Sequence, residues 1–230
     1  LKNIESFIDR SLMNLGVEVI DLVQLHCPPS EICGKKETYE MMDEIVKKGK
    51  INYYGVSVEK VSEALDAIKY PNVKSIQIIF NVFRQKPSEI FFKEAKKNNV
   101  AIIARVPLAS GLLTGKMNSQ SSFPENDHRN YNINGDAFDV GETFSGINFA
   151  KGLEAVEELK KIKPSDFSLT DLSLKWILSH PEVTVVIPGA KNKIQAELNV
   201  KASELNEINS IKDNIKEIYN KYFKKDIHSN

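Results

Sequence analysis

One histidine in the sequence stands where it could face a ligand. His26 directly follows the apolar, β-branched segment at residues 19–25, which predicts a buried strand. Residues at the carboxyl ends of parallel strands commonly line binding sites. His26 is therefore a candidate ligand-facing residue, and a structural, hydrogen-bonded histidine fits the same spacing equally well.

Two glycine-containing segments could bind phosphate. Residues 110–116 read Ser-Gly-Leu-Leu-Thr-Gly-Lys, but a P-loop requires Gly at Ser110 and Ser or Thr at Met117. Backbone N–H groups after a strand could still hold a phosphate there. Residues 187–191 lie between a predicted strand and a predicted helix, where the helix N-terminus and Lys191 could accept an anion. A simple turn fits that segment equally well, and no GxGxxG supports a Rossmann site.

The composition excludes several classes of function. Lys plus Arg and Asp plus Glu both number 31 in the 230 residues, so no basic excess indicates binding to nucleic acid or to an anionic membrane. The apolar runs are far shorter than a membrane span. Cys27 and Cys33 lack the paired spacing of a zinc site and predict free thiols, as in a cytoplasmic protein. No metal constellation is visible.

Strands and helices alternate along the chain. This alternation predicts a parallel sheet with right-handed crossovers, either an open doubly wound sheet or part of an eight-stranded barrel. The long polar segment at about 117–148 follows a strand, and such segments usually build a binding site. Strands are predicted near 19–25, 53–58, 75–80, 100–105 and 184–187, and helices near 1–15, 37–49, 60–69, 88–98, 150–162, 169–179, 191–201 and 204–223.

Short segments spread over residues 1–200 match one family in order. They are Leu12 to Gly16, Ile20 to Leu22, Leu25 to His26, Gly49 to Ile51, Tyr54 to Ser57, Gln77 to Asn81, Pro107 to Gly115, Asp127 to Arg129, and Ile187 to Lys191 with Gln195 and Asn199. Each is modest alone, but the ordered set closely resembles the aldo-keto reductases. The resemblance implies a (β/α)8 TIM barrel, truncated at its N-terminus, with residues 1–230 as one incomplete domain and about five of eight strands.

The resemblance also implies the cofactor NADP (NADPH), bound in an extended form across the top of the barrel. Lys191 would meet the 2′-phosphate, and Arg105 falls where many members place an aromatic ring that stacks on the nicotinamide. The other implied contacts are Ser57 and Gln77 to the carboxamide, Pro107, Leu108, Ser110, Gly111 and Lys116 to the pyrophosphate, and Gly189, Ala190, Gln195 and Asn199 to the adenosine end.

His26 resembles the family's catalytic histidine, which orients the substrate carbonyl. The family's proton donor, a Tyr with a Lys and an Asp that lower its pKa, belongs to segments upstream of residue 1. The expected function is NADP(H)-dependent reduction of a small-molecule aldehyde or ketone to an alcohol, if the native chain is complete. The alternatives are an inactive homologue that binds a nucleotide or a partner, and an inert fragment.

Five strands cannot close an eight-stranded barrel. The strands at 19–25 and 184–187 would leave open, apolar edges, which invite aggregation or strand exchange. We therefore expect residues 1–230 alone not to form a stable, active monomer.

Overall fold

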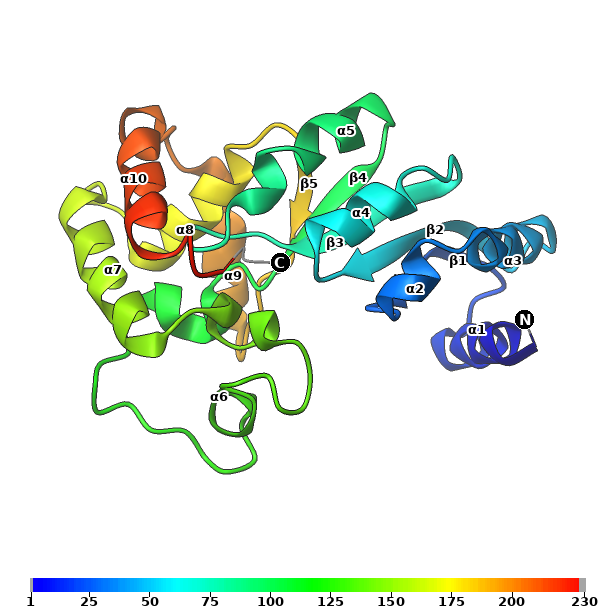
Figure 1. Ribbon diagram of the computed structural model, residues 1–230, viewed down its shortest axis with the longest axis horizontal. Helices are drawn as coiled ribbons and strands as arrows, with labels where there is room; N and C mark the ends of the chain where they lie inside the picture. The colour runs from blue at the N-terminus through cyan, green and yellow to red at the C-terminus, as the bar shows by residue number, and fades with distance from the viewer. Residues whose placement is uncertain (1, 228–230) are drawn as a thin grey trace. The chain divides into compact units, whose positions relative to one another are not determined.

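The computed structural model describes residues 2–227. The chain forms two compact units: unit 1 contains residues 1–78 and 91–102, and unit 2 contains residues 79–90 and 103–230 (Figure 1). That residues 1–230 make one incomplete domain stays a prediction.

The five predicted strands are all present, and each begins and ends within two residues of its predicted bounds. They are β1 (Ile20–His26), β2 (Ile51–Val58), β3 (Val73–Ile79), β4 (Ala101–Arg105) and β5 (Val183–Val186). They form one sheet in the order β1-β2-β3-β4-β5, and β1 with β2 and β2 with β3 pair in parallel. A doubly wound sheet would reverse its order partway along. The sequential order therefore confirms the barrel type.

The register of β1, β2 and β3 stacks polar residues in two layers. His26 lies opposite Ser57, which lies opposite Gln77. Two residues earlier, Gln24 lies opposite Gly55. A shift in register between residues 54 and 55 then sets Gly55 opposite Ser75. A Cβ at Gly55 would overlap the Ser75 side chain and lie 2.5 Å from its carbonyl oxygen, so the close approach of these strands requires glycine.

Amphipathic helices cover the strands of unit 1. In α3, Tyr39, Met42 and Ile45 recur every three residues on one buried face. The Tyr39 hydroxyl donates a hydrogen bond of 2.7 Å to the carbonyl of Cys33, which anchors this helix to the preceding turn. The helices are α1 (Lys2–Leu15), α2 (Ser30–Cys33), α3 (Lys36–Lys47), α4 (Val61–Ala67) and α5 (Phe91–Lys97).

Unit 2 contains α-helices and several 3-10 turns. The hydroxyl of Ser168 caps α8 by accepting from the amide of Asp171, and the Asp171 carboxylate accepts from the Ser168 amide, which together form a capping box. Helices α7 and α10 lie side by side (Figure 1). The elements are η1 (Lys86–Ser88), η2 (Ala109–Thr114), α6 (His128–Tyr131), η3 (Val140–Glu142), η4 (Phe144–Gly146), α7 (Phe149–Ile162), α8 (Leu169–Leu178), α9 (Lys193–Lys201), η5 (Ala202–Glu204), η6 (Asn209–Ile211) and α10 (Lys212–Tyr222).

The predicted C-terminal helix at 204–223 is wrong at its start. Leu205 is extended, with φ −67° and ψ 155°, and the continuous helix α10 begins only at Lys212. Asn206, Asn209 and Ser210 favour turns because their short polar side chains compete for backbone hydrogen bonds. Among residues 2–227, no helix is long and apolar enough to cross a membrane.

The outermost strands are the least covered parts of the sheet. In unit 1, Leu22 of β1 is exposed, and α1 exposes Phe7 and Met13. In unit 2, Val185 of β5 is exposed, and α9 buries none of its residues. The central strand β3 has Val73, Ile76, Ile78 and Ile79 buried. These exposed apolar residues fit the prediction of open edges at β1 and β5.

Candidate active site and cofactor-binding cavity

Three of the predicted site residues lie side by side in unit 1. His26, Ser57 and Gln77 occupy matching positions on β1, β2 and β3. The Ser57 hydroxyl is buried and donates a 3.3 Å hydrogen bond to the Gln77 side-chain carbonyl. His26 is exposed, so its imidazole is accessible to a ligand. The ladder of backbone hydrogen bonds thus produces the grouping that the sequence predicts.

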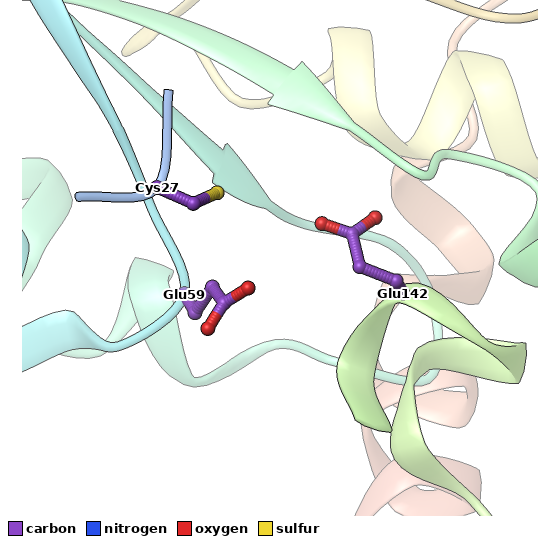
Figure 2. Close-up of side chains that lie close together, drawn as sticks. All are labelled: Cys27, Glu59 and Glu142. Atoms are coloured by element: carbon purple, nitrogen blue, oxygen red, sulfur yellow. The ribbon is translucent and has the colours of Figure 1, made fainter. Parts of the chain in front are cut away.

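Cys27 extends this group beyond the end of β1. Its φ of 44° turns the chain out of the strand, and its amide donates to the carbonyl of Ser57 at 2.9 Å. The Cys27 thiol lies 3.7 Å from the Ser57 hydroxyl. Figure 2 shows Cys27 beside Glu59, which follows β2; the thiol sulfur and a carboxylate oxygen lie within 4.8 Å. Two such side chains by themselves fall short of the four ligands of a zinc site, and the absence of a metal stays a prediction.

A second polar layer lies one step earlier on the same strands. The Gln24 amide donates to the Ser75 hydroxyl at 2.8 Å, across the space that Gly55 leaves open. Sequence reasoning overlooked Gln24. Its position two residues before His26 was the available signal, because alternate residues of a strand share one face. This layer lies two residues before the positions of Ser57 and Gln77 on the same strands.

Unit 2 contains a cavity of about 1070 Å³ that the predicted cofactor residues line. Its walls come from the segment after β4, the polar segment 128–142, the first turn of α8, and the segment from residue 187 into α9. The predicted residues that line it are Pro107, Leu108, Ser110, Gly111, Lys116, Gly189, Ala190, Lys191, Gln195 and Asn199. Two stretches about 80 residues apart in the sequence, predicted to bind one ligand, therefore line one cavity.

The segment after β4 has unusual backbone angles. Ala109 and Ser110 have φ of 45° and 54°, a region that non-glycine residues rarely occupy. Gly111 has φ of 95°, and a Cβ there would lie 3.1 Å from the Met117 side chain. Strained backbone of this kind tends to occur at ligand sites. These residues form the 3-10 turn η2, whereas a P-loop would continue as an α-helix, which agrees with the exclusion of a P-loop from the sequence.

The segment at 189–199 is ordered by its own side chains. The Gln195 side chain accepts from the amide of Lys191 at 2.7 Å, and Asn199 donates to the carbonyl of Gly189 at 3.2 Å. Asn192 caps α9 by accepting from the amide of Gln195. Lys191 is exposed, so its ammonium group can reach an anion in the cavity.

Arg129 also lines the cavity, although no role was predicted for it. Asp127 accepts two hydrogen bonds from its guanidinium, at 2.9 and 2.6 Å, and the guanidinium carbon lies 4.4 Å from the centre of the Phe123 ring. The Arg129 guanidinium holds the pKa of the Asp127 carboxyl well below its usual value. The Asp-His-Arg sequence was the available signal. A cation fixed in this way is suited to phosphate.

Arg105 ends β4, just before the cavity begins. Its side chain is 6% exposed and forms an ion pair with Glu142, which is 24% exposed and lines the cavity. The carbonyl of Glu142 accepts from the Ser110 hydroxyl, which in turn accepts from the amide of Phe144. Sequence reasoning missed Glu142. That Arg105 lies at the nicotinamide, as the sequence resemblance implies, remains a prediction.

A parallel sheet whose strands follow one another in sequential order is the arrangement of a (β/α)-barrel protein, a fold in which ligand sites lie at the carboxyl ends of the strands. Residues 2–220 match the sequence model of the Aldo/keto reductase family, and the chain belongs to this family.

Two relatives and one solved structure illustrate the similarity. The uncharacterized oxidoreductase YqkF of Bacillus subtilis is 30% identical over 87% of this chain and 60% of its own length. The NADP(+) aldo-keto reductase yakc of Schizosaccharomyces pombe is 30% identical over 85% of this chain and 56% of its own. The glycerol dehydrogenase AKR11B4 of Gluconobacter oxydans superimposes with a TM-score of 0.75 at 27% identity, covering 95% of this chain and 64% of that one. The chain thus spans less than two thirds of the length of these relatives.

Proposed function

We propose that the protein is an NADP(H)-dependent oxidoreductase that reduces an aldehyde or ketone carbonyl to an alcohol. The observation that supports this proposal most directly is the cavity of about 1070 Å³. It is lined both by residues predicted for the pyrophosphate and by residues predicted for the adenosine end. Family membership supports the oxidoreductase class. A small-molecule carbonyl substrate and a cytoplasmic location belong to the same proposal.

The cavity fits an extended dinucleotide in size and in chemistry. Its volume of about 1070 Å³ lies just above about 300–1,000 Å³, the usual range of small-molecule sites. Lys116, Arg129 and Lys191 supply cations for phosphate groups, and Gly111 keeps the wall open beside Met117. When bound, a nicotinamide dinucleotide supplies hydride chemistry. NADP is favoured over NAD because Lys191 is available for a 2′-phosphate.

The residues of unit 1 orient the reacting groups in this proposal. Ser57 and Gln77 hold a carboxamide, which both can contact through hydrogen bonds. His26, exposed at the end of β1, orients the substrate carbonyl. Proton transfer to the carbonyl oxygen needs a general acid. By the family resemblance this is a tyrosine with a lysine and an aspartate, and the proposed reaction requires all three.

The first test is the intact mass of the protein from its natural source. A mass on the order of ten kDa above the 25.9 kDa of this sequence corresponds to three more βα units. The same preparation should consume NADPH with a generic aldehyde. NADPH binding without turnover on a broad panel of carbonyls would favour a non-catalytic nucleotide-binding homologue. If NADPH did not bind at all, both the reductase and the nucleotide-binding function would be contradicted.

A further inference from the structure

Two short segments of unit 2 share an unusual backbone conformation. Val106, Ala109 and Ser110 follow β4 and have φ of 52°, 45° and 54°, and Phe144 and Ser145 have φ of 51° and 63°. In the part of the chain that the structure describes, seven non-glycine residues have a positive φ, and these are five of the seven. Such a conformation costs free energy in a residue with a Cβ, so it persists only where surrounding contacts enforce it.

The buried side chain of Asn81 joins the two segments. Its Nδ2 donates to the carbonyl of Val106 at 2.8 Å and to the hydroxyl of Ser145 at 2.7 Å. Its Oδ1 accepts from the amides of Phe83 and Arg84, at 2.9 and 3.1 Å. A carbonyl only accepts and a backbone amide only donates, so these partners fix the orientation of the Asn81 amide group. Asn81 is 0% exposed, and all of its hydrogen-bonding capacity is used within the protein.

The Ser110 hydroxyl makes a second connection between the same segments. It donates to the carbonyl of Glu142 at 3.1 Å and accepts from the amide of Phe144 at 3.0 Å. A serine hydroxyl has one hydrogen, and the Glu142 carbonyl takes it. The ionised oxygens of a pyrophosphate only accept, so this hydroxyl cannot donate to them while it holds Glu142.

We propose that Asn81 and the Ser110 hydroxyl position the cavity wall, holding residues 106–111 and 142–145 together in the conformation that binds the cofactor. This rests on the proposed function, in which the cavity binds NADP(H). Val106 and Ser110 are among the described residues that line the cavity, and Asn81 is not. Asn81 therefore acts through the segments that it joins, and Ser110 serves the pyrophosphate through the backbone that its hydroxyl orders.

The first measurement is the Kd of NADPH for the complete natural polypeptide carrying Asn81→Asp. An aspartate keeps the acceptor for the amides of Phe83 and Arg84 and loses both donors to the two segments. If the binding conformation is then populated for about a tenth of the time, the Kd rises about tenfold, and we expect a rise of this size. Calorimetric titration measures it at a temperature at which Trp176 emission shows the variant to be folded.

Asn132→Asp is the matched control. Asn132 is equally buried, its Oδ1 accepts from two backbone amides, and its Nδ2 donates to the Thr143 hydroxyl. None of these hydrogen bonds reaches residues 106–111. We expect Asn132→Asp to lower stability as Asn81→Asp does, but to raise the Kd of NADPH by less than about threefold. If both substitutions raised the Kd equally, Asn81 would have only a general structural role and the inference would be wrong.

Hydrogen exchange of the nucleotide-free protein separates positioning from ligand contact. In Asn81→Asp and in Ser110→Ala, amides of residues 106–111 and 142–145 should exchange about tenfold faster, while those of α10 keep the wild-type rate. Ser110→Ala introduces no charge, so it tests the inference even if Asn81→Asp does not fold. If Ser110→Ala raised the Kd and left exchange unchanged, its hydroxyl would contact the ligand directly and the inference would be wrong.

The two measurements also distinguish this inference from the proposed function. Faster exchange with an unchanged Kd for NADPH would overturn the positioning role and leave the proposed function intact. If the wild-type polypeptide does not bind NADPH, the proposed function fails, and the positioning role fails with it.

Discussion

The two parts of the candidate site differ in what positions their residues. In unit 1, His26, Ser57 and Gln77 lie on adjacent strands, and backbone pairing sets their spacing. In unit 2, Ser110 and Arg129 lie on long connections, and side-chain hydrogen bonds and ion pairs hold them. Strand pairing is part of the folding of the sheet, whereas loop contacts contribute locally. Changes in the strand layer should therefore alter stability, and changes around the cavity should alter binding.

The largest effect should follow from Gly55→Ala in the strand layer. The new Cβ would overlap Ser75 and push β2 away from β3. We expect a loss of about 3 kcal/mol in the free energy of unfolding, the upper range for overpacking. Urea denaturation of the complete polypeptide measures it.

Gly34→Ala is the matched control in the same unit. Gly34 has φ of −92°, and a Cβ there would meet nothing within 4 Å. We expect it to change stability by less than about 0.5 kcal/mol. If Gly55→Ala were no more costly than Gly34→Ala, the close contact of β2 and β3 would not be what positions Ser57 and Gln77.

A smaller effect, confined to binding, should follow from Lys191→Ala at the cavity. Loss of a charged contact to the 2′-phosphate should raise the Kd for NADPH about tenfold, which is about 1.4 kcal/mol. The Kd for NADH, which lacks this phosphate, should change less than twofold. Lys193→Ala is the control, since Lys193 pairs with Glu197 and does not line the cavity. If Lys191→Ala raised the Kd values for NADPH and NADH by the same factor, Lys191 would not contact the 2′-phosphate.

The same contrast explains what the sequence could and could not reveal. The strands were predictable because apolar runs and turn residues mark them locally, so His26 was found by its position at a strand end, whereas Ser57 and Gln77 were assigned through the family resemblance. The ion pair of Arg105 with Glu142 was not predictable, because no periodic pattern joins a strand end to a loop residue 37 positions later. The sequence showed Asp127 and Arg129 only as part of a short motif and did not reveal the ion pair between them. Loop geometry depends on tertiary contacts that the local sequence does not encode.

The smallest effect concerns His180, which packs against Trp176 and Phe80 in unit 2. Helix α8 begins at the cavity wall, and His180 follows its C-terminal end. The Nδ1 of His180 lies 2.9 Å from the Trp176 carbonyl, and its ring contacts Phe80 edge-on. Burial lowers the pKa of His180 below its ordinary value of about 6.5. The unfolded chain therefore takes up a proton more readily than the folded one, and the free energy of unfolding should decline as pH falls below about 6.5, levelling off below the folded-state pKa.

Trp176, the only tryptophan in the sequence, gives a fluorescence signal specific to unit 2 for this measurement. Urea unfolding followed by Trp176 emission between pH 7.5 and 5.5 should show a modest loss of stability. His180→Gln keeps a side-chain donor for the Trp176 carbonyl but cannot titrate, so it should flatten that dependence. His128→Gln is the control, because His128 lies at the cavity and contacts Thr143 by a hydrogen bond of 3.2 Å. If the free energy of unfolding of His180→Gln kept the same pH dependence, other groups would be responsible for the proton uptake, and His180 would not be the titrating group.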